Sequence, residues 1–426
     1  MLHANDPAVR EYLLQGNFGL EKESLRVTGD GYLAHTPHPF PEDDPNIVRD
    51  FCENQTEINT GVHPTADGAV SELREHYERI QRTLMELPVR EYLWPFSNPP
   101  YIRGEDDVPV ACFEGGRSFK TAYRNYLSDR YGRYTMCFSG IHFNFSFGED
   151  LLEQDFRVSG MADRREYRDQ FYLELAEKAA QYGWILTAVT AASPMLDSSF
   201  VEKGKTGGDC FTGMASVRCG PTGYWNFFAP VFDYRDIRSY ADSIQRYVDD
   251  GLLAAPSELY YPVRLKPRGE NDLTTLRENG VNHIELRMFD LNPLDPAGVR
   301  VEDVRFAQLL LVFLASIPRR DFPESAQVQA VQNFKNAASY DLKTVKIVPA
   351  SGAVCSVADA ARDVLYEMRR FYRDFPEDVQ AVLQFETDKF RDPENRYAWI
   401  LRREFADGYV TKGLELARKR QEELRV

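Results

Sequence analysis

The sequence lacks the cysteine patterns of zinc-binding and disulfide-rich proteins. Its six cysteines are spread through 426 residues, without a CxxC pair and without the spacing of a zinc site. Scattered cysteines in a chain of this size are typical of a reducing compartment. The first residues also lack the basic and apolar segments of a signal peptide. We therefore expect a cytoplasmic protein whose cysteines are reduced.

Positive charge and long apolar runs are scarce as well. The formal net charge of −15 argues against nonspecific nucleic-acid binding and against an anionic membrane surface, because both need basic patches. The most apolar stretch, residues 306–317, is too short to span a bilayer, so we expect a buried core helix there. Neither a nucleic acid nor a membrane is expected as a partner.

The common phosphate-binding loops are missing too. Gly204-Lys205-Thr206 looks like the end of a P-loop, but the first glycine of that motif would fall on Ser199. The chain also has no GxGxxG run. A nucleotide would therefore have to bind by other means. The glycine-rich segment 202–209 is either a flexible surface loop or a lid over phosphate.

Hydrophobic periodicity predicts helices and strands in irregular order. Strands are expected at about 18–27, 134–147, 214–219, 258–266 and 282–290. Helices are expected at about 67–87, 118–130, 163–190, 235–250, 301–316, 356–373 and 376–390, with another from about 410. Because strands and helices do not alternate regularly, the pattern favours an α+β fold with a mostly antiparallel sheet over a doubly wound parallel sheet.

Two of the predicted strands carry acidic side chains in pairs or beside a cation. Side chains at i and i+2 of a strand share a face, so Glu21 and Glu23 point the same way, as do Glu285 and Arg287. Carboxylates held side by side are costly to keep charged unless a cation sits between them. A hard divalent cation that carries phosphate would fit, since Mg²⁺ takes oxygen ligands. The alternative for Glu21 and Glu23 is a solvated strand edge.

A third strand places a histidine among polar side chains. Residues 141–147 alternate strictly, with one apolar face and with His142 and Asn144 on the polar one. His142 is therefore either a metal ligand or a hydrogen-bonded core histidine. The acidic segment 50–57 supplies further carboxylates, or is a solvated turn.

Four basic residues are candidates for contact with phosphate: Arg218, Arg264, Lys266 and Arg287. Arg287 lies two residues from Glu285, where it could neutralise a transferred phosphoryl group. A structural ion pair with Glu285 is the alternative.

Nine segments, taken in their order along the chain, resemble glutamate–cysteine ligases of the bacterial branch. They are GLEKESLRV (19–27), DFCENQTE (50–57), WPFSNPPYI (94–102), FKTAYRNYLSDRYG (119–132), SGIHFNFSF (139–147), ASP (192–194), SVRCGPTGY (216–224), ELYYPVR (258–264) and HIELRMFDLNP (283–293). Together they cover roughly residues 15 to 300. The resemblance is specific because no single segment carries it.

The resemblance implies a glutamine-synthetase-like α+β fold, in which a curved, mostly antiparallel sheet forms a funnel with helices outside. It also implies a single catalytic domain over residues 1–426, without the ATP-grasp extension of bifunctional relatives. The part from about 320 to 426 is expected to be helical and has no diagnostic motif.

The resemblance further assigns roles to residues of this chain. The ligands of a bound Mg²⁺, or of Mn²⁺ as the alternative ion, would be Glu21, Glu23, Asp50, Glu57, His142 and Glu285. Arg218 and Arg287 would contact the phosphoryl group and glutamate, and Arg264 and Lys266 would lie near ATP. The pocket for the cysteine acceptor would be formed by Phe51, Tyr123, Leu127, Tyr224 and Tyr260.

The implied activity is the ATP-dependent ligation of the γ-carboxylate of L-glutamate to the amine of L-cysteine through γ-glutamyl phosphate, the first step of glutathione biosynthesis. Two alternatives remain open. One is a γ-glutamyl ligase for another amine, and the other is an inactive paralogue that senses glutamate or a nucleotide. Oligomeric state and feedback inhibition by glutathione are not predicted by the sequence.

Overall fold

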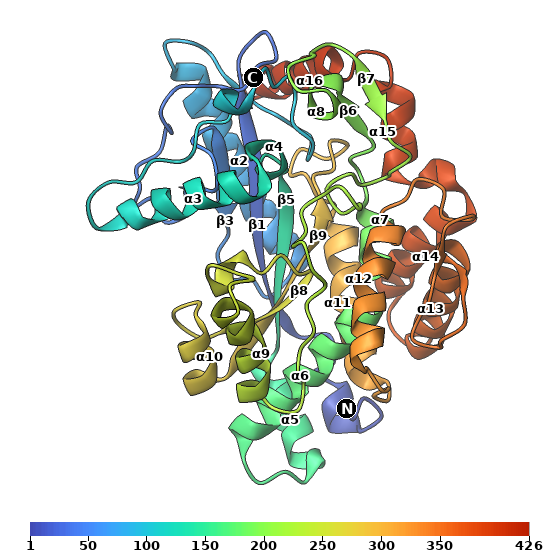
Figure 1. Cartoon of the computed structure of the whole chain (residues 1–426). Helices are drawn as coiled ribbons and strands as arrows, with labels where there is room; N and C mark the ends of the chain where they lie inside the picture. The colour runs from blue at the N-terminus through green and yellow to red at the C-terminus, as the bar shows by residue number, and fades with distance from the viewer. Residues whose placement is uncertain (426) are drawn as a thin grey trace.

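A seven-stranded antiparallel sheet organises the structure, a computed structural model that describes residues 1–425 (Figure 1). The strand order is β2-β3-β1-β5-β9-β8, and β4 pairs with the far end of β1. The strands are β1 (Gly16–Val27), β2 (Ile47–Arg49), β3 (Gln55–Asn59), β4 (Tyr92–Leu93), β5 (Gly140–Phe147), β8 (Val263–Pro267) and β9 (Val281–Asp290). Two small two-stranded sheets pair β6 (Met195–Asp197) with β7 (Asp209–Phe211), and β10 (Lys346–Ile347) with β11 (Cys355–Ser356).

The sheet has one apolar and one polar face. On β5, Ile141, Phe143, Phe145 and Phe147 are at most 1% exposed and belong to the main hydrophobic core. This confirms the predicted two-residue alternation. The core face is covered by α2 (Ala66–Glu86), α6 (Arg164–Tyr182) and α7 (Trp184–Thr190), which contact β1, β8 and β9. The polar face is free to carry the charged side chains.

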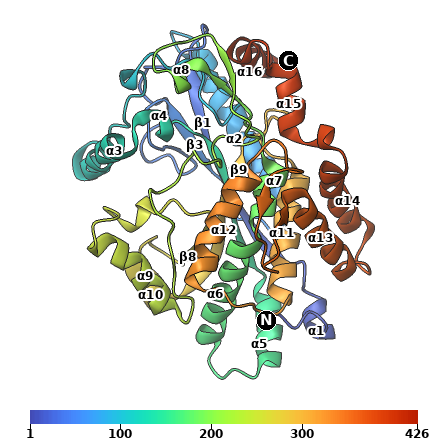
Figure 2. The ribbon, with the colours of Figure 1, turned by 45° about the vertical axis from the view of Figure 1, so that its right-hand side comes forward.

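Further helices build a second layer. Helix α11 (Val301–Ser316) packs on α6, and α12 (Glu324–Ala337) packs on α7. Helices α13 (Val357–Phe371) and α14 (Glu377–Arg391) pack outside α11 (Figure 2). The remaining helices are α1 (Pro7–Arg10), α3 (Ser118–Tyr131), α4 (Arg133–Met136), α5 (Glu149–Ser159), α8 (Ser198–Val201), α9 (Ile237–Asp249), α10 (Leu273–Asn279), α15 (Tyr397–Phe405) and α16 (Tyr409–Glu423). After residue 320 the chain forms α12 to α16 together with the short strands β10 and β11.

Four sequence predictions need correction. The strand predicted over 258–266 begins only at Val263, because a 3-10 turn at Pro256–Glu258 and an irregular stretch precede it. The strand predicted from residue 134 begins at Gly140, because residues 133–136 form α4. The segment 214–219 is not a strand, since only isolated bridges form at Met214 and Ser216. The helix predicted over 163–190 is interrupted at Gly183, where a Cβ would come within 2.5 Å of the Ala179 carbonyl oxygen and 2.9 Å of the Phe334 ring. That glycine permits the close approach of α12.

The apolar segment 306–317 is confirmed as part of a buried helix, α11, whose leucines at 309, 310, 311 and 314 are at most 2% exposed. Among residues 1–425, no helix is both long enough and apolar enough to cross a membrane.

A buried charge cluster joins the C-terminal helices to the core. Lys389 Nζ lies 2.8 Å from Asp303 Oδ1 and 2.8 Å from Glu386 Oε2, and it donates to the Val189 carbonyl at 3.0 Å. Tyr397 donates to the other oxygen of Asp303 at 2.8 Å. All three charged groups are at most 2% exposed. With two carboxylates for one ammonium, one acid is in excess. Burial, followed by the charge of Asp303, raises the pKa of Glu386 well above its ordinary value, although Lys389 opposes the shift.

We expect Glu386→Gln to stabilise the protein at neutral pH. The pKa of Glu386 is raised in the folded state, so the folded state retains a proton that the unfolded state loses above pH 4.5. This costs stability as pH rises, on the order of 1.4 kcal/mol for each pKa unit of difference. The amide mimics the protonated acid and avoids the cost.

Urea unfolding at several pH values checks this prediction. The variant should gain stability over the parent at pH 7 to 8, and the gain should vanish as pH falls below about 4.5. Equal or lower stability of Glu386→Gln at pH 8 would mean that the ionised acid is the form the cluster prefers.

Candidate active site

Strand register brings the predicted acids and the histidine together on the polar face. Glu21 on β1 lies opposite His142 on β5, and Asn144 on β5 lies opposite Glu285 on β9. The pairing of β5 with β9 shifts by one residue between Ile141 and Phe143, so a β-bulge on β9 falls at His142. Bulges re-aim side chains, and here the bulge lies directly beside the acids.

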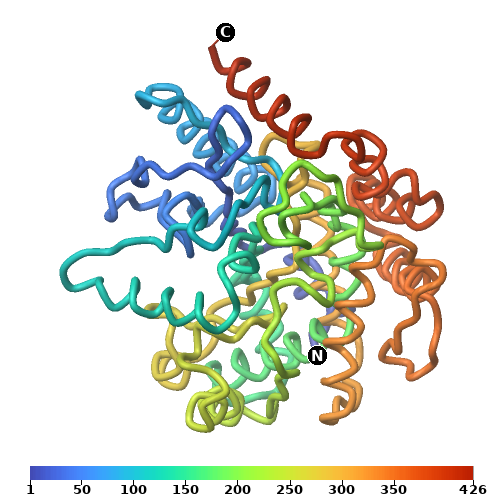
Figure 3. The backbone as a smooth tube through the Cα atoms, turned by 45° about the horizontal axis from the view of Figure 1, so that its top comes forward, coloured from blue at the N-terminus to red at the C-terminus, as the bar shows by residue number. Residues whose placement is uncertain are grey.

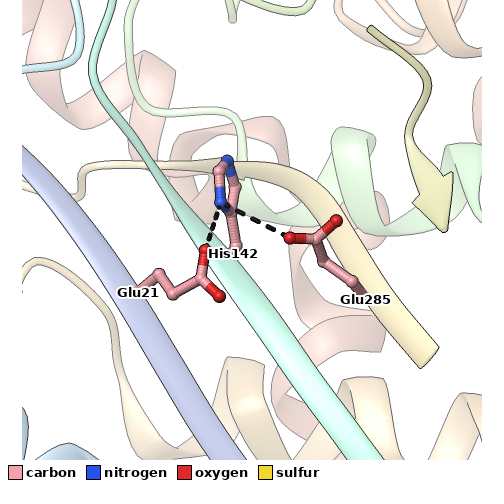
Figure 4. A group of neighbouring side chains, drawn as sticks. All are labelled: Glu21, His142 and Glu285. Atoms are coloured by element: carbon pink, nitrogen blue, oxygen red, sulfur yellow. Dashed lines mark hydrogen bonds and ion pairs between the residues drawn. The ribbon is translucent and has the colours of Figure 1, made fainter. Parts of the chain in front are cut away.

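Glu21, His142 and Glu285 form the centre of the site (Figure 4). One candidate ligand atom from each lies within 4.8 Å of the others. His142 Nδ1 is 2.9 Å from Glu21 Oε2 and 3.8 Å from Glu285 Oε1. Asn144 Nδ2 donates to the second oxygen of Glu21 at 2.9 Å. The histidine is thus oriented by carboxylates.

Glu23, Glu57 and Asp50 extend this acidic face. Glu23 lies opposite Glu57 in the register of β1 with β3, and its Oε1 is 3.7 Å from His142 Nε2. Burial raises the pKa of Glu57 well above its ordinary value, and the charges of Asp50, Glu21 and Glu23 add to the shift. Burial and the charge of Asp50 also raise the pKa of Glu23. The fold therefore concentrates negative charge that it does not itself neutralise.

The donor set fits a hard divalent cation. Glu285 Oε2, His142 Nε2 and the Asn144 side-chain oxygen are buried without a hydrogen-bond partner among residues 1–425. Unpaired buried polar atoms are costly. Carboxylate oxygens with one imidazole are a ligand set that Mg²⁺ or Mn²⁺ accepts. These residues could hold such an ion, and its charge would offset the repulsion between the acids.

Cations surround Glu285, which is completely buried. Arg287 donates to its Oε1 at 3.1 Å, and Lys266 Nζ lies 3.2 Å from the same oxygen. Burial alone would raise the pKa of Glu285, but the charges of Arg287 and Lys266 outweigh it and hold the pKa well below its ordinary value. Glu285 is therefore ionised. Arg287 and Glu285 form an ion pair, which was the alternative interpretation of Arg287 in the sequence.

Arg264 lies opposite Glu285 in the register of β8 with β9. Its guanidinium donates to the carbonyl of Ser257 at 3.1 Å and to that of Leu259. Arg264 and Lys266 thus reach the polar face from the edge strand of the sheet.

Arg218 reaches the site from an irregular segment and is held over β5 and β9. Its Nη1 donates to the carbonyl oxygens of Arg287 at 3.0 Å and Phe289 at 3.4 Å. A Cβ on Gly140 would come within 2.2 Å of the Arg218 Cζ, so only glycine leaves room for this side chain. The backbone N–H of Gly140 also donates to Glu23 Oε2 at 2.8 Å. Gly140 thereby positions a cation and an acid together.

Aromatic side chains lie beside the two arginines. The rings of Tyr224 and Tyr260 are 4.2 Å apart, and with Arg218 and Arg287 they line a cavity of about 40 Å³. The other residues of the predicted acceptor pocket, Phe51, Tyr123 and Leu127, pack in the same hydrophobic cluster as the two tyrosines but do not line that cavity.

A network around Glu258 was not predicted from the sequence. Tyr131 on α3 donates to Glu258 Oε1 at 2.7 Å, and Asn226 donates to the Glu258 carbonyl at 2.8 Å. Its only signal in the sequence is the position of Glu258 at the start of the run 258–264. The hydrogen bonds join residues far apart in the chain, which local patterns do not report.

Solved structures share this arrangement of an antiparallel sheet and its covering helices. The structure resembles that of glutamate–cysteine ligase from Francisella tularensis, solved in complex with AMP, with a TM-score of 0.86 over 96% of this chain and 89% of that chain at 23% identity. It also resembles a bifunctional glutathione synthetase from Pasteurella multocida, with a TM-score of 0.85 over 99% of this chain and 54% of that chain at 26% identity. The predicted glutamine-synthetase-like α+β fold is confirmed.

The sequence comparisons place the chain within one family. The glutamate–cysteine ligase family matches residues 2–249 and 226–337, so the chain belongs to that family. The glutathione biosynthesis bifunctional proteins GshAB of Listeria welshimeri and Listeria monocytogenes are 32% and 33% identical over 98% of this chain. The chain spans about half the length of these curated relatives, 55% and 56%.

We expect Gly140→Ala to displace the Arg218 side chain and to cost about 1 to 3 kcal/mol of unfolding free energy, the usual range for overpacking. Gly19→Ala is the matched control on the neighbouring strand, since its nearest side-chain contact would be an ordinary 3.6 Å. Thermal unfolding and a crystal structure of each variant measure the two effects. If Gly140→Ala is as stable as Gly19→Ala and leaves Arg218 in place, the Arg218 side chain does not pack closely against Gly140.

Proposed function

We propose that this protein ligates the γ-carboxylate of L-glutamate to the amine of L-cysteine at the expense of ATP, through γ-glutamyl phosphate. This reaction would be the first step of glutathione biosynthesis. Membership of the glutamate–cysteine ligase family supports the proposal. The observation that carries it is the polar sheet face, where the buried carboxylate Glu285 lies between His142, Lys266 and Arg287.

The residues predicted as metal ligands, Glu21, Glu23, Asp50, Glu57, His142 and Glu285, would hold Mg²⁺ or Mn²⁺. When bound, the divalent cation supplies positive charge that offsets the charge gathered between the phosphates of ATP and glutamate. Two observations support this assignment: atoms of Glu285 and His142 have no hydrogen-bond partner among residues 1–425, and the pKa of Glu57 is raised.

The arginines and Lys266 would act on phosphate. A carboxylate is a poor electrophile, so an oxygen of the γ-carboxylate first attacks the γ-phosphorus of ATP and ADP leaves. Arg287 and Arg218 would stabilise the charge on the phosphoryl group during this transfer. Arg264 and Lys266 would contact the phosphates of ATP. The hydrogen bond to Glu285 already orients the Arg287 side chain on the polar face. Less conformational entropy is therefore lost when Arg287 contacts the phosphoryl group.

The acceptor pocket would receive the side chain of cysteine. The amine attacks the acyl carbon of γ-glutamyl phosphate and inorganic phosphate leaves. Tyr224 and Tyr260, with Phe51, Tyr123 and Leu127 packed in the same cluster, would exclude water that could hydrolyse the acyl phosphate. The small cavity beside Arg218 and Arg287 agrees with a short acceptor side chain.

The whole chain, residues 1–426, would act as one catalytic domain, because a single core cluster runs from the N-terminal segment to α14. Six free cysteines agree with work in a reducing cytoplasm.

We expect phosphate release from ATP to require glutamate, an amine and Mg²⁺ together, with cysteine as the best amine. Glu21→Gln, Glu285→Gln and His142→Ala should each lower turnover about 100- to 1,000-fold, the loss typical of a main electrostatic stabiliser. Glu72→Gln is a matched control, since it also alters a carboxylate in contact with a histidine, His63, but on α2.

Steady-state rates with circular dichroism melting separate chemistry from folding. If no amine stimulates phosphate release, the chain is not a ligase, and an inactive sensor becomes the better account. If another amine stimulates phosphate release more than cysteine does, cysteine is not the natural acceptor. If Glu285→Gln turns over at nearly the parental rate, the polar face does not take part in catalysis.

We expect the acceptor pocket to take 2-aminobutyrate and to discriminate against serine. A methyl group is close in size to the thiol, and apolar contacts reject a near-isostere only weakly. A buried hydroxyl without a strong partner is costly. Tyr123→Ala should raise the KM for cysteine more than the KM for glutamate. Equal changes in both constants, or a parental preference for serine, would show that the pocket lies elsewhere.

A further inference from the structure

Glu258 is a buried carboxylate outside the polar sheet face. It lies at the end of a short 3-10 turn, Pro256–Glu258, and is 0% exposed. Its Oε1 accepts from the Tyr131 hydroxyl at 2.7 Å, and the Arg130 Nε lies 2.9 Å from the same oxygen as an ion pair. Its Oε2 accepts from the Ala254 backbone at 2.6 Å. Both oxygens are therefore occupied by groups of the protein.

These contacts join three segments that are distant in sequence. Tyr131 and Arg130 are at the end of α3, which also carries Tyr123 and Leu127. Asn226 donates to the Tyr131 hydroxyl at 3.1 Å and to the Glu258 carbonyl, and its oxygen accepts from the Tyr260 backbone at 2.7 Å. The segments so joined are those that bring Tyr123, Tyr224 and Tyr260 to the proposed acceptor pocket.

Helix α3 depends on such contacts because it is otherwise lightly packed. Leu127 is its only buried residue. Together with the loop before it, the helix projects from the body of the molecule (Figure 3). Besides the Glu258 network, Ser257 donates to the Tyr123 hydroxyl at 3.1 Å, Arg130 donates to the Leu252 carbonyl at 2.6 Å, and Arg124 donates to the Asp50 carbonyl at 2.6 Å. Most of these contacts tie α3 to residues 252–258.

We propose that Glu258 is a positioning residue that fixes α3 against the segment 254–260, and thereby sets the affinity for the amine acceptor. The proposal rests on the proposed function for the identity of the acceptor. The carboxylate of Glu258 bonds to Tyr131, Arg130 and Ala254 and to none of the acids of the polar face. Its loss should therefore affect the acceptor pocket more than the sites for glutamate and ATP.

Glu258→Gln is the informative variant because the amide keeps the shape and removes the charge. We expect the KM for cysteine to rise about 10-fold or more, the effect of weakening a buried hydrogen bond to a charged group. The KM values for glutamate and ATP should change by less than about 2-fold, well within the range that leaves those sites intact. Tyr131→Phe removes the hydroxyl donor and should act in the same direction. The two changes together should cost less than the product of their separate effects, because they disrupt one interaction.

Asp155→Asn is the matched control. Asp155 is 1% exposed, accepts from the Tyr167 hydroxyl at 2.6 Å and from the His3 backbone at 2.7 Å, and lies in α5. Like Glu258, it is a buried carboxylate that accepts from a tyrosine hydroxyl and from a backbone N–H, but in another part of the fold. We expect it to lower the melting temperature without changing the ratio of the KM for cysteine to the KM for glutamate.

Hydrogen exchange gives a readout that does not need activity. The backbone amides of residues 118–131 should exchange faster in Glu258→Gln and in Tyr131→Phe than in the parent. Their exchange rates should be unchanged in Asp155→Asn. If Glu258→Gln does not fold, the KM values and the exchange rates of Tyr131→Phe test the proposal on their own. An unchanged exchange rate in α3, or equal rises in all three KM values, would overturn the proposal. Absence of any ligase activity in the parent would overturn the proposed function and the acceptor role together, and exchange would still report whether Glu258 anchors α3.

Discussion

The structure depends on one buried carboxylate, Glu285, at the centre of the sheet. Two charges, Arg287 and Lys266, lie within 3.2 Å of the same oxygen of this side chain, and His142 is 3.8 Å away. Removing one partner of a buried ion pair strongly destabilises the folded protein, because the remaining charge is left without compensation. The register of β5, β8 and β9 therefore has to be held closely, and the apolar residues of β5 hold it by packing on the core face.

The same face carries more negative charge than its own cations neutralise. The raised pKa values of Glu23 and Glu57 are consistent with that excess, as is the Glu285 oxygen that has no hydrogen-bond partner among residues 1–425. Such local costs are typical of functional sites and are offset by the stability of the rest of the fold. In the proposed function the cost is removed by a bound cation and its phosphate ligands, so the arrangement that is unfavourable for the empty protein is favourable for the complex.

Sequence reasoning succeeded where a short-range rule decides the outcome. The two-residue period of a strand placed Glu21 with Glu23, His142 with Asn144, and Glu285 with Arg287, each pair on one face. It did not predict the bulge opposite His142, which depends on how two strands pair. Residues 134–136 were mistaken for strand because buried tyrosine and methionine suit either element. The helices α5, α10, α12 and α15 lie outside every predicted helix. The Glu258 network joins residues 127 positions apart, beyond the reach of any local pattern.

In the proposed function, the polar face activates the γ-carboxylate of glutamate by phosphorylation. Glutamate labelled with ¹⁸O in both γ-carboxylate oxygens tests it directly, with ATP, Mg²⁺ and cysteine as co-substrates. Attack of the carboxylate on ATP followed by displacement by the amine predicts one ¹⁸O in each phosphate released, with the other retained in the amide carbonyl of the product. Phosphate free of ¹⁸O, measured by mass spectrometry, would contradict the acyl-phosphate route and with it the role assigned to the site.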